Sequence, residues 1–206
     1  MNRPAPARKQ ELLARLNGRP IVLVGMMGAG KTTVGRKLAA KLDRTFVDCD
    51  KEIEAAANMS IADFFEAHGE EEFRAGEKRV ISRILKDRDV VVATGGGAFM
   101  NEQTRKLIED EAVSVWIKAD FELLFSRVSR RATRPLLKTA NPRETLQKLI
   151  DVRDPVYAEA DVTVISKDVP QDTVATEIVG LLYDWSRSHL DMPETGQSSE
   201  ESANAS

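Results

Sequence analysis

Short runs of β-branched and other apolar residues alternate along this chain with longer segments in which apolar residues recur every three or four positions. The short runs are rich in Val and Ile, so each one predicts a buried β-strand. The predicted strands are 21–25, 45–48, 90–94, 112–118 and 162–166. Strands that alternate with helices favour an α/β fold, here a three-layer α/β/α sandwich around a five-stranded parallel sheet.

The segments between the strands carry helix-start signals, in which a side-chain oxygen can accept a hydrogen bond from the first turn. The apolar spacing predicts helices over 31–42 and 71–86. Capping residues predict further helices that begin near positions 61, 121 and 142, the last of which runs towards Tyr157. These capping residues are Ser60 with Asp63, Asp120, and Asn141 with Pro142 and Glu144.

The composition predicts a single central domain over residues 20–187. Three segments differ from it in composition, one before the domain, one after it and one within it. Residues 1–19 form an N-terminal extension, in which the leucines of 10–16 could dock as a short helix or belong to a frayed arm. Residues 188–206 form a polar tail that we expect to be disordered. The stretch 130–141 is polar, basic and bracketed by helices, which is typical of a mobile lid.

The charge balance excludes some classes of partner. The 206 residues include 30 Lys and Arg and 33 Asp and Glu, for a formal net charge of −3. A nucleic-acid-binding protein would usually be basic, so we expect no nucleic-acid partner. We also expect no membrane partner, because no apolar run approaches the roughly 20 residues of a spanning helix. With Cys49 as the one cysteine, these features predict a cytoplasmic protein.

The clearest motif follows the first strand directly. Residues Gly25 to Thr32 read GMMGAGKT, a complete G-x-x-x-x-G-K-[ST] loop at the start of a predicted helix. Such a loop cradles phosphates with its backbone N–H groups, while Lys31 would reach the β- and γ-phosphates and Thr32 would offer its hydroxyl to Mg²⁺. The alternative is an ordinary glycine turn between a strand and a helix.

A metal site in such a loop usually needs a second ligand, often an aspartate at the end of another strand. The third predicted strand ends in Thr94, so a different strand must supply it. Asp48 and Asp50 end the second strand, two residues apart and on the same side if the extended geometry continues. One could hold a metal-bound water while the other faces a substrate. Alternatively, either aspartate caps the helix that follows.

Three further segments could bind a phosphoryl acceptor. Arg74 and Glu77 lie three residues apart on a predicted helix, a spacing that is also typical of a solvated ion pair. The glycine run 95–97 follows a buried strand at the carboxyl edge of the sheet, where open α/β sheets bind ligands. Arg153 lies towards the end of a helix, where an arginine often merely faces solvent.

In order and spacing, these motifs resemble the shikimate kinase family, whose fold is of the nucleoside monophosphate kinase type. The resemblance covers residues 21–182. It is carried by GMMGAGKTTVGRKLA, FVDCDKEIE, FFEAHGEEEFR, ATGGGA, TRPLL and VRDPVYAEAD.

The resemblance implies the roles of individual residues. Asp50 would orient or deprotonate the attacking hydroxyl, and Arg74 and Arg153 would grip the substrate carboxylate. The implied catalytic residues are Lys31, Asp50 and Arg134, of which Arg134 would close over the phosphates from the lid. The implied metal residues are Thr32 and Asp48. The implied ATP-binding residues are Gly28, Ala29, Gly30, Lys31, Thr32, Thr33, Arg127 beside the adenine, and Arg134. The implied shikimate-binding residues are Asp50, Arg74, Glu77, Gly95, Gly96, Gly97, Arg153, Phe65 and Phe73, with Ile61 in the apolar lining.

The expected function is therefore the ATP-dependent phosphorylation of the 3-hydroxyl of shikimate, with Mg²⁺ as cofactor, by a monomeric cytoplasmic enzyme. A gluconate kinase or a nucleoside monophosphate kinase of the same architecture is the nearest alternative. A nucleotide-binding module without turnover is the alternative from another class.

Overall fold

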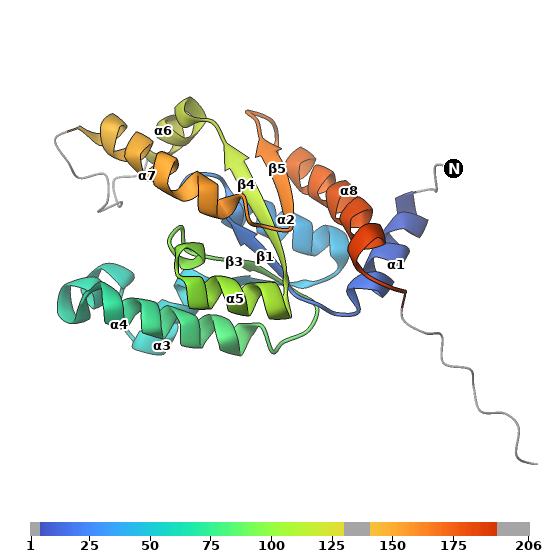
Figure 1. The fold of residues 1–206 in the computed structure, drawn as a ribbon, viewed down its shortest axis with the longest axis horizontal. Helices are drawn as coiled ribbons and strands as arrows, with labels where there is room; N and C mark the ends of the chain where they lie inside the picture. The colour runs from blue at the N-terminus through green and yellow to red at the C-terminus, as the bar shows by residue number, and fades with distance from the viewer. Residues whose placement is uncertain (1–4, 130–140, 193–206) are drawn as a thin grey trace, which may run out of the picture.

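The computed structural model describes residues 5–129 and 141–192, which form a five-stranded sheet with helices packed on both faces (Figure 1). The strands are β1 (Ile21–Val24), β2 (Thr45–Asp48), β3 (Val90–Ala93), β4 (Val113–Ala119) and β5 (Val162–Ser166). They are hydrogen-bonded in the order β2-β3-β1-β4-β5, and every pair is parallel. In the centre, Ile21 pairs with both Val91 and Val113. The predicted sheet is confirmed.

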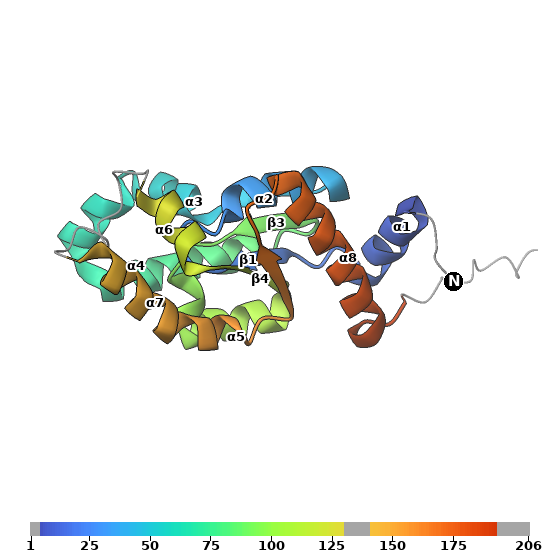
Figure 2. The same ribbon diagram turned by 90° about the horizontal axis from the view of Figure 1, so that it is seen from above.

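Helices α2 and α5 lie on opposite sides of this sheet (Figure 2). Helix α8 packs against α2 and β5, and α1 packs in turn against α8. The helices are α1 (Ala5–Leu16), α2 (Lys31–Leu42), α3 (Cys49–Ala57), α4 (Ile61–Ile84), α5 (Glu102–Glu111), α6 (Phe121–Ser129), α7 (Pro142–Tyr157) and α8 (Gln171–His189), with a short 3-10 helix, η1 (Ala98–Met100), after β3.

The strands form the core because they are covered from both sides. Every residue of β1 and of β3 is buried, which explains their uninterrupted runs of apolar side chains. Since all five strands are parallel, their carboxyl ends meet at one edge of the sheet. The segments that follow β1, β2 and β3 therefore leave the sheet on the same side, and these segments carry the candidate site residues.

The predicted caps are present in the structure. Ser60 Oγ accepts a hydrogen bond from the Asp63 N–H at 3.1 Å, and Asp120 Oδ1 accepts one from the Leu123 N–H at 2.8 Å. Asn141 caps α7 in the same way. The two helices predicted around Gly69 follow each other without a loop, because Gly69 (φ 79°, ψ 179°) introduces a sharp kink within α4.

The N-terminal extension packs on the fold rather than standing away from it. Leu12 and Leu16 of α1 are buried in the core, and Arg15 Nη1 donates a hydrogen bond to the Leu190 carbonyl at 2.8 Å. The expectation of a frayed arm is therefore wrong for residues 5–16. The expected tail also begins too early, because α8 continues to His189. Residues 193–206 lie outside the described part of the chain, as do residues 130–140 of the expected lid and Arg134 within it.

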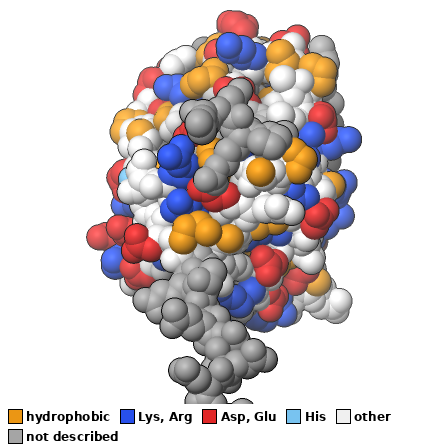
Figure 3. Space-filling model, turned by 90° about the vertical axis from the view of Figure 1, so that its right-hand side faces the viewer, with side chains coloured by type: hydrophobic (Ala, Val, Ile, Leu, Met, Phe, Trp, Pro, Cys, Tyr) orange, Lys and Arg blue, Asp and Glu red, His pale blue; other side chains and the backbone are white. Residues whose placement is uncertain are grey.

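On the described part of the face around α1 and α8 (Figure 3), neither acidic nor basic side chains predominate. In Figure 3, acidic and basic side chains of the described residues are interspersed over this face. None of the helices in residues 5–129 and 141–192 combines the length and the apolar character that a transmembrane segment requires.

Candidate active site

The glycine-rich loop between β1 and α2 uses glycine where the backbone has a positive φ. Gly25 (φ 132°) and Gly28 (φ 85°) adopt conformations that other residues avoid. A Cβ at position 28 would also stand 2.9 Å from Cγ1 of Val128, so α6 lies too close for a side chain there. The loop ends at the N-terminus of α2, where the first N–H groups and the helix dipole favour an anion. The alternative of an ordinary glycine turn is not favoured by this geometry.

Lys31 is the first residue of α2, and its side chain folds back over the loop. Its Nζ donates hydrogen bonds to the carbonyls of Gly25 at 2.6 Å and Met26 at 3.0 Å. The ammonium group therefore lies against the backbone of the loop, and the residue as a whole is buried. An ammonium group held there can bind phosphate oxygens in place of these two carbonyl oxygens.

The hydroxyl of Thr32 contacts the end of β2. Thr32 Oγ1 donates a hydrogen bond to Asp48 Oδ2 at 3.0 Å. Asp48 occupies the N-cap position of α3, but its side chain accepts no capping hydrogen bond, so the alternative of a simple cap is wrong for this residue. A hydroxyl and a carboxylate oxygen are hard ligands that fit Mg²⁺.

The described residues include no cluster of three or more His, Cys, Asp or Glu side chains that could hold a metal ion. Such a sparse protein ligand set still suits Mg²⁺, which keeps several waters and takes further ligands from substrate phosphates.

Asp50 does not continue the strand, contrary to the sequence expectation. Helix α3 begins at Cys49, whose side chain is buried, and Asp50 lies in the first helical turn. Its carboxylate nevertheless comes close to the glycine run after β3. Asp50 Oδ1 lies 2.9 Å from the point where a Cβ on Gly95 would stand, and Glu77 Oε1 lies 3.1 Å from the same point. The chain thus brings two carboxylates from different helices to Gly95.

Arg74 and Glu77 form a partly buried ion pair, so the interpretation as a fully solvated pair is wrong. Arg74 Nη1 lies 2.6 Å from Glu77 Oε2, and the Glu77 side chain is only 1% exposed. Burial raises the pKa of Glu77, while the charge of Arg74 opposes this shift. The same guanidinium fills the space beside Gly97, where even a methyl group would collide with it.

Arg153 reaches the glycine run from α7. Its Nη1 donates a hydrogen bond to the Gly96 carbonyl at 3.3 Å. The two arginines of the predicted clamp therefore lie against neighbouring glycines, although they come from helices about 80 residues apart in the sequence. A guanidinium has several N–H donors in a planar fork, so two guanidinium groups at one place favour a carboxylate ligand.

Aromatic side chains from α4 lie next to this clamp. The rings of Phe65 and Phe73 are 4.3 Å apart between centroids, and Phe73 is buried. The Arg74 guanidinium lies over the Phe73 ring at 5.2 Å. Ile61 is half-buried at the start of the same helix. An apolar wall beside charged groups is typical of a site that excludes water.

Arg127 extends from α6 towards the phosphate-binding loop. Its Nη1 lies 3.4 Å from the carbonyls of both Gly28 and Ala29. Thr33 is exposed in the first turn of α2. Among the described residues, the structure thus groups Lys31, Thr32, Asp48 and Arg127 around the phosphate-binding loop, and Asp50, Arg74, Glu77 and Arg153 around the glycine run 95–97.

Sequence reasoning gave no role to two residues that belong to this arrangement. Gln171 begins α8, and its buried Oε1 lies 2.7 Å from the Cβ position of Gly30 without a hydrogen-bond partner among the described residues. Tyr157 is buried at the end of α7 and donates its hydroxyl to the Gly96 carbonyl. The position of Gln171 after the last strand was the available signal, since that strand ends at the same edge of the sheet.

Comparison with known proteins supports the resemblance. The family model described as shikimate kinase matches residues 27–183. Shikimate kinases from Nitrobacter winogradskyi and Bradyrhizobium diazoefficiens are each 54% identical to this chain. The first match covers 84% of this chain and 80% of the relative, and the second covers 87% and 85%.

A solved structure agrees with these sequence relatives. Shikimate kinase from Acinetobacter baumannii, in complex with shikimate, superposes with a TM-score of 0.79 at 37% identity. The match covers 84% of this chain and 97% of the other. The family match, the fold and the arrangement of the candidate residues therefore all agree with the resemblance found in the sequence.

Proposed function

We propose, because this chain belongs to the shikimate kinase family, that the residues around the two glycine loops transfer the γ-phosphoryl group of ATP to the 3-hydroxyl of shikimate. The observation that carries this assignment of residues is the convergence of Arg74 and Arg153 on the glycine run 95–97, beside Asp50. Family membership disfavours a gluconate kinase, a nucleoside monophosphate kinase or a module without turnover.

The phosphate side of the site is built from the loop and from Lys31. The backbone N–H groups at the start of α2 hold the phosphates, and the Lys31 ammonium stabilises the negative charge on the oxygens of the transferred group. Thr32 and Asp48 would hold Mg²⁺, which when bound neutralises phosphate charge. Arg127, against the Gly28 and Ala29 carbonyls, supports the loop from the side on which we expect the adenine.

The acceptor side holds shikimate by its carboxylate and its hydroxyls. Arg74 and Arg153 bind the carboxylate, and Glu77 keeps Arg74 in place through the 2.6 Å ion pair. A guanidinium can serve Glu77 and a substrate carboxylate at the same time, because it has five N–H donors. The backbone of residues 95–97 offers polar groups to the hydroxyls, while Phe65 and Phe73 keep water away.

Asp50 is the group that takes the proton. The 3-hydroxyl oxygen of shikimate bonds to the γ-phosphorus as the bond to the bridging oxygen of ADP breaks, and the hydroxyl proton passes to the Asp50 carboxylate. Phosphoryl transfer depends mainly on alignment and charge stabilisation, so the reaction needs few catalytic groups beyond these.

We also propose that the enzyme acts as a monomer in the cytoplasm. One chain supplies every candidate residue of the described site, and the cytoplasm supplies ATP. Light scattering coupled to size-exclusion chromatography at assay concentration tests the first statement, and a dimer mass would contradict it.

The reaction is tested by coupled ADP release with shikimate, quinate and gluconate in parallel, with and without Mg²⁺. We expect the highest kcat/KM with shikimate and no turnover after chelation of Mg²⁺. Faster turnover with gluconate would assign a different acceptor, and the absence of ADP release with every acceptor would favour the nucleotide-binding module.

A further inference from the structure

The hydroxyl of Tyr157 lies at the centre of the acceptor side. Its ring is buried between Phe99 and Trp116, with centroid distances of 6.4 and 6.0 Å. Its hydroxyl donates a hydrogen bond to the Gly96 carbonyl, the same oxygen that accepts from Arg153 Nη1. Since Tyr157 follows Arg153 by one helical turn, both donors come from the same face of α7.

The Gly96 carbonyl differs from its neighbours in how it is held. The carbonyls of Gly95 and Gly97 accept backbone hydrogen bonds from Ala98 and Met100, at 3.3 and 3.1 Å. The Gly96 carbonyl instead accepts hydrogen bonds from two side chains, those of Arg153 and Tyr157. A peptide between two glycines can rotate at little cost, because neither residue has a Cβ. Side-chain donors are therefore what select one orientation of this peptide.

A peptide unit is planar and trans, so its carbonyl and its N–H point in opposite directions. By drawing the Gly96 carbonyl towards α7, Tyr157 turns the Gly97 N–H away from α7. Arg153 shares the carbonyl with Tyr157 and does not have to satisfy it alone, so its other N–H groups can serve a carboxylate.

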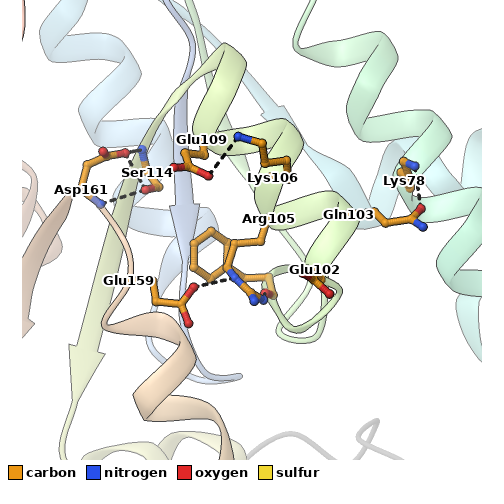
Figure 4. A pocket seen from close by; sticks show the side chains of 10 residues that line it. Lys78, Glu102, Gln103, Arg105, Lys106, Glu109, Ser114, Glu159 and Asp161 are labelled. Carbon is orange, nitrogen blue, oxygen red and sulfur yellow. Dashed lines mark hydrogen bonds and ion pairs between the residues drawn. The ribbon is translucent and has the colours of Figure 1, made fainter.

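A second contact ties the chain just beyond Tyr157 to the segment after β3. Arg105 of α5 forms an ion pair with Glu159, two residues beyond Tyr157, with 2.7 Å between Nε and Oε2 (Figure 4). The same guanidinium donates from Nη1 to the Phe99 carbonyl at 3.0 Å. Arg105 thereby joins the end of α7 to η1, the short helix that follows the glycine run.

We propose that Tyr157 is a positioning residue, whose hydroxyl fixes the Gly96 peptide and Arg153 in the arrangement that binds the acceptor. This proposal rests on the function proposed above. Burial raises the pKa of Tyr157 to about 12, so the phenol keeps its proton and remains a donor at neutral pH.

The test is Tyr157→Phe, with Tyr183→Phe as the matched control. Tyr183 is the other tyrosine, also buried, and donates its hydroxyl to Glu11 of α1 at 3.0 Å, away from the site. Loss of one buried hydrogen bond predicts an increase of about 3- to 10-fold in the shikimate KM for Tyr157→Phe. The ATP KM should stay within about 2-fold, and Tyr183→Phe should change neither KM.

Wild-type turnover with shikimate must be measured first, because its absence would refute the proposed function rather than the role of Tyr157. With an active wild type, an unchanged shikimate KM in Tyr157→Phe, or equal changes for both substrates, overturns the proposal. The thermal midpoint of Tyr157→Phe is measured alongside the two KM values. If this isosteric variant does not fold, the hydroxyl is required for the fold itself, and the proposal of a positioning role is overturned.

Discussion

Replacing Gly97 by alanine should weaken shikimate binding without harming the fold. A Cβ at position 97 would collide with Nη2 of Arg74, which is the nearest atom, and would stand 2.8 Å from Cζ and 2.9 Å from Nη1. Ordinary van der Waals contacts of a Cβ begin at 3.4 Å, so Cζ must retreat by 0.6 Å, the difference between 3.4 and 2.8 Å, and Nη2 must retreat further. Because the Arg74 side chain is long and partly exposed, it can make this movement. The movement weakens the contact that we expect between Arg74 and the shikimate carboxylate.

The magnitude follows from the interaction that is displaced. A hydrogen bond between charged groups contributes about 1.5–3 kcal/mol, and its strength falls steeply with distance and angle. Partial loss of the Arg74 contact therefore predicts an increase of about 10-fold in the shikimate KM, equivalent to about 1.4 kcal/mol. The φ of Gly97 is −104°, which alanine accepts. The less flexible unfolded chain should then add about 0.4–1 kcal/mol to the free energy of unfolding.

The assay measures KM for each substrate and the thermal midpoint of three proteins: wild type, Gly97→Ala and Gly180→Ala. Gly180→Ala is the control, because Gly180 lies on α8 outside the glycine run and a Cβ there would meet no atom within 4 Å. We expect an unchanged ATP KM throughout and a thermal midpoint for Gly97→Ala at or above that of wild type. An unchanged shikimate KM in Gly97→Ala, or an equal increase in Gly180→Ala, would contradict the predicted displacement of Arg74.

Three further substitutions test other parts of the molecule. Lys31→Ala should lower kcat by about 10²- to 10³-fold or more, whereas Lys37→Ala on the exposed side of α2 should not; near wild-type ADP release by Lys31→Ala would contradict the phosphate role. Asp50→Asn should lower kcat by about 10²- to 10⁴-fold with ATP affinity retained in calorimetry, and loss of ATP affinity would instead indicate a role at the metal. Leu12→Ala should lower the free energy of unfolding by about 2–5 kcal/mol, measured in denaturant titrations, because Leu12 is fully buried in α1. Both KM values should stay unchanged. A changed KM would show that the packing of α1 affects the site.

The strands and most helix starts could be predicted because their signals are local. A buried strand needs consecutive apolar residues, and a cap needs one polar side chain at one position, as Asp120 shows. The docking of α1 has no such signal. Leu12 and Leu16 have helical spacing whether or not a partner covers them, and the partner surface on α8 lies more than 150 residues away in the sequence.

Burial within the site was equally hard to predict. The spacing of Arg74 and Glu77 is the same on a solvated helix face and in a partly buried ion pair. What decides between them is the packing of α4 against α3, α5 and η1, which is a tertiary property. The prediction that the strand geometry continues to Asp50 was wrong for a related reason. The sequence does not mark clearly where β2 ends, whereas in the structure α3 begins at Cys49.

The three glycines that follow β3 illustrate how function constrains the backbone here. None of them has a positive φ, so turn geometry alone does not require glycine at these positions. Two of them are nevertheless crowded by side chains, with Asp50 and Glu77 against Gly95, and Arg74 against Gly97. Gly96 between them offers its carbonyl to Tyr157 and Arg153. Because α3, α4 and α7 all direct polar groups to this one loop, a side chain at either end would displace a group that we assign to the acceptor. The absence of side chains from this loop therefore leaves room for the proposed base, Asp50, and the proposed carboxylate clamp, Arg74 and Arg153, around one small substrate.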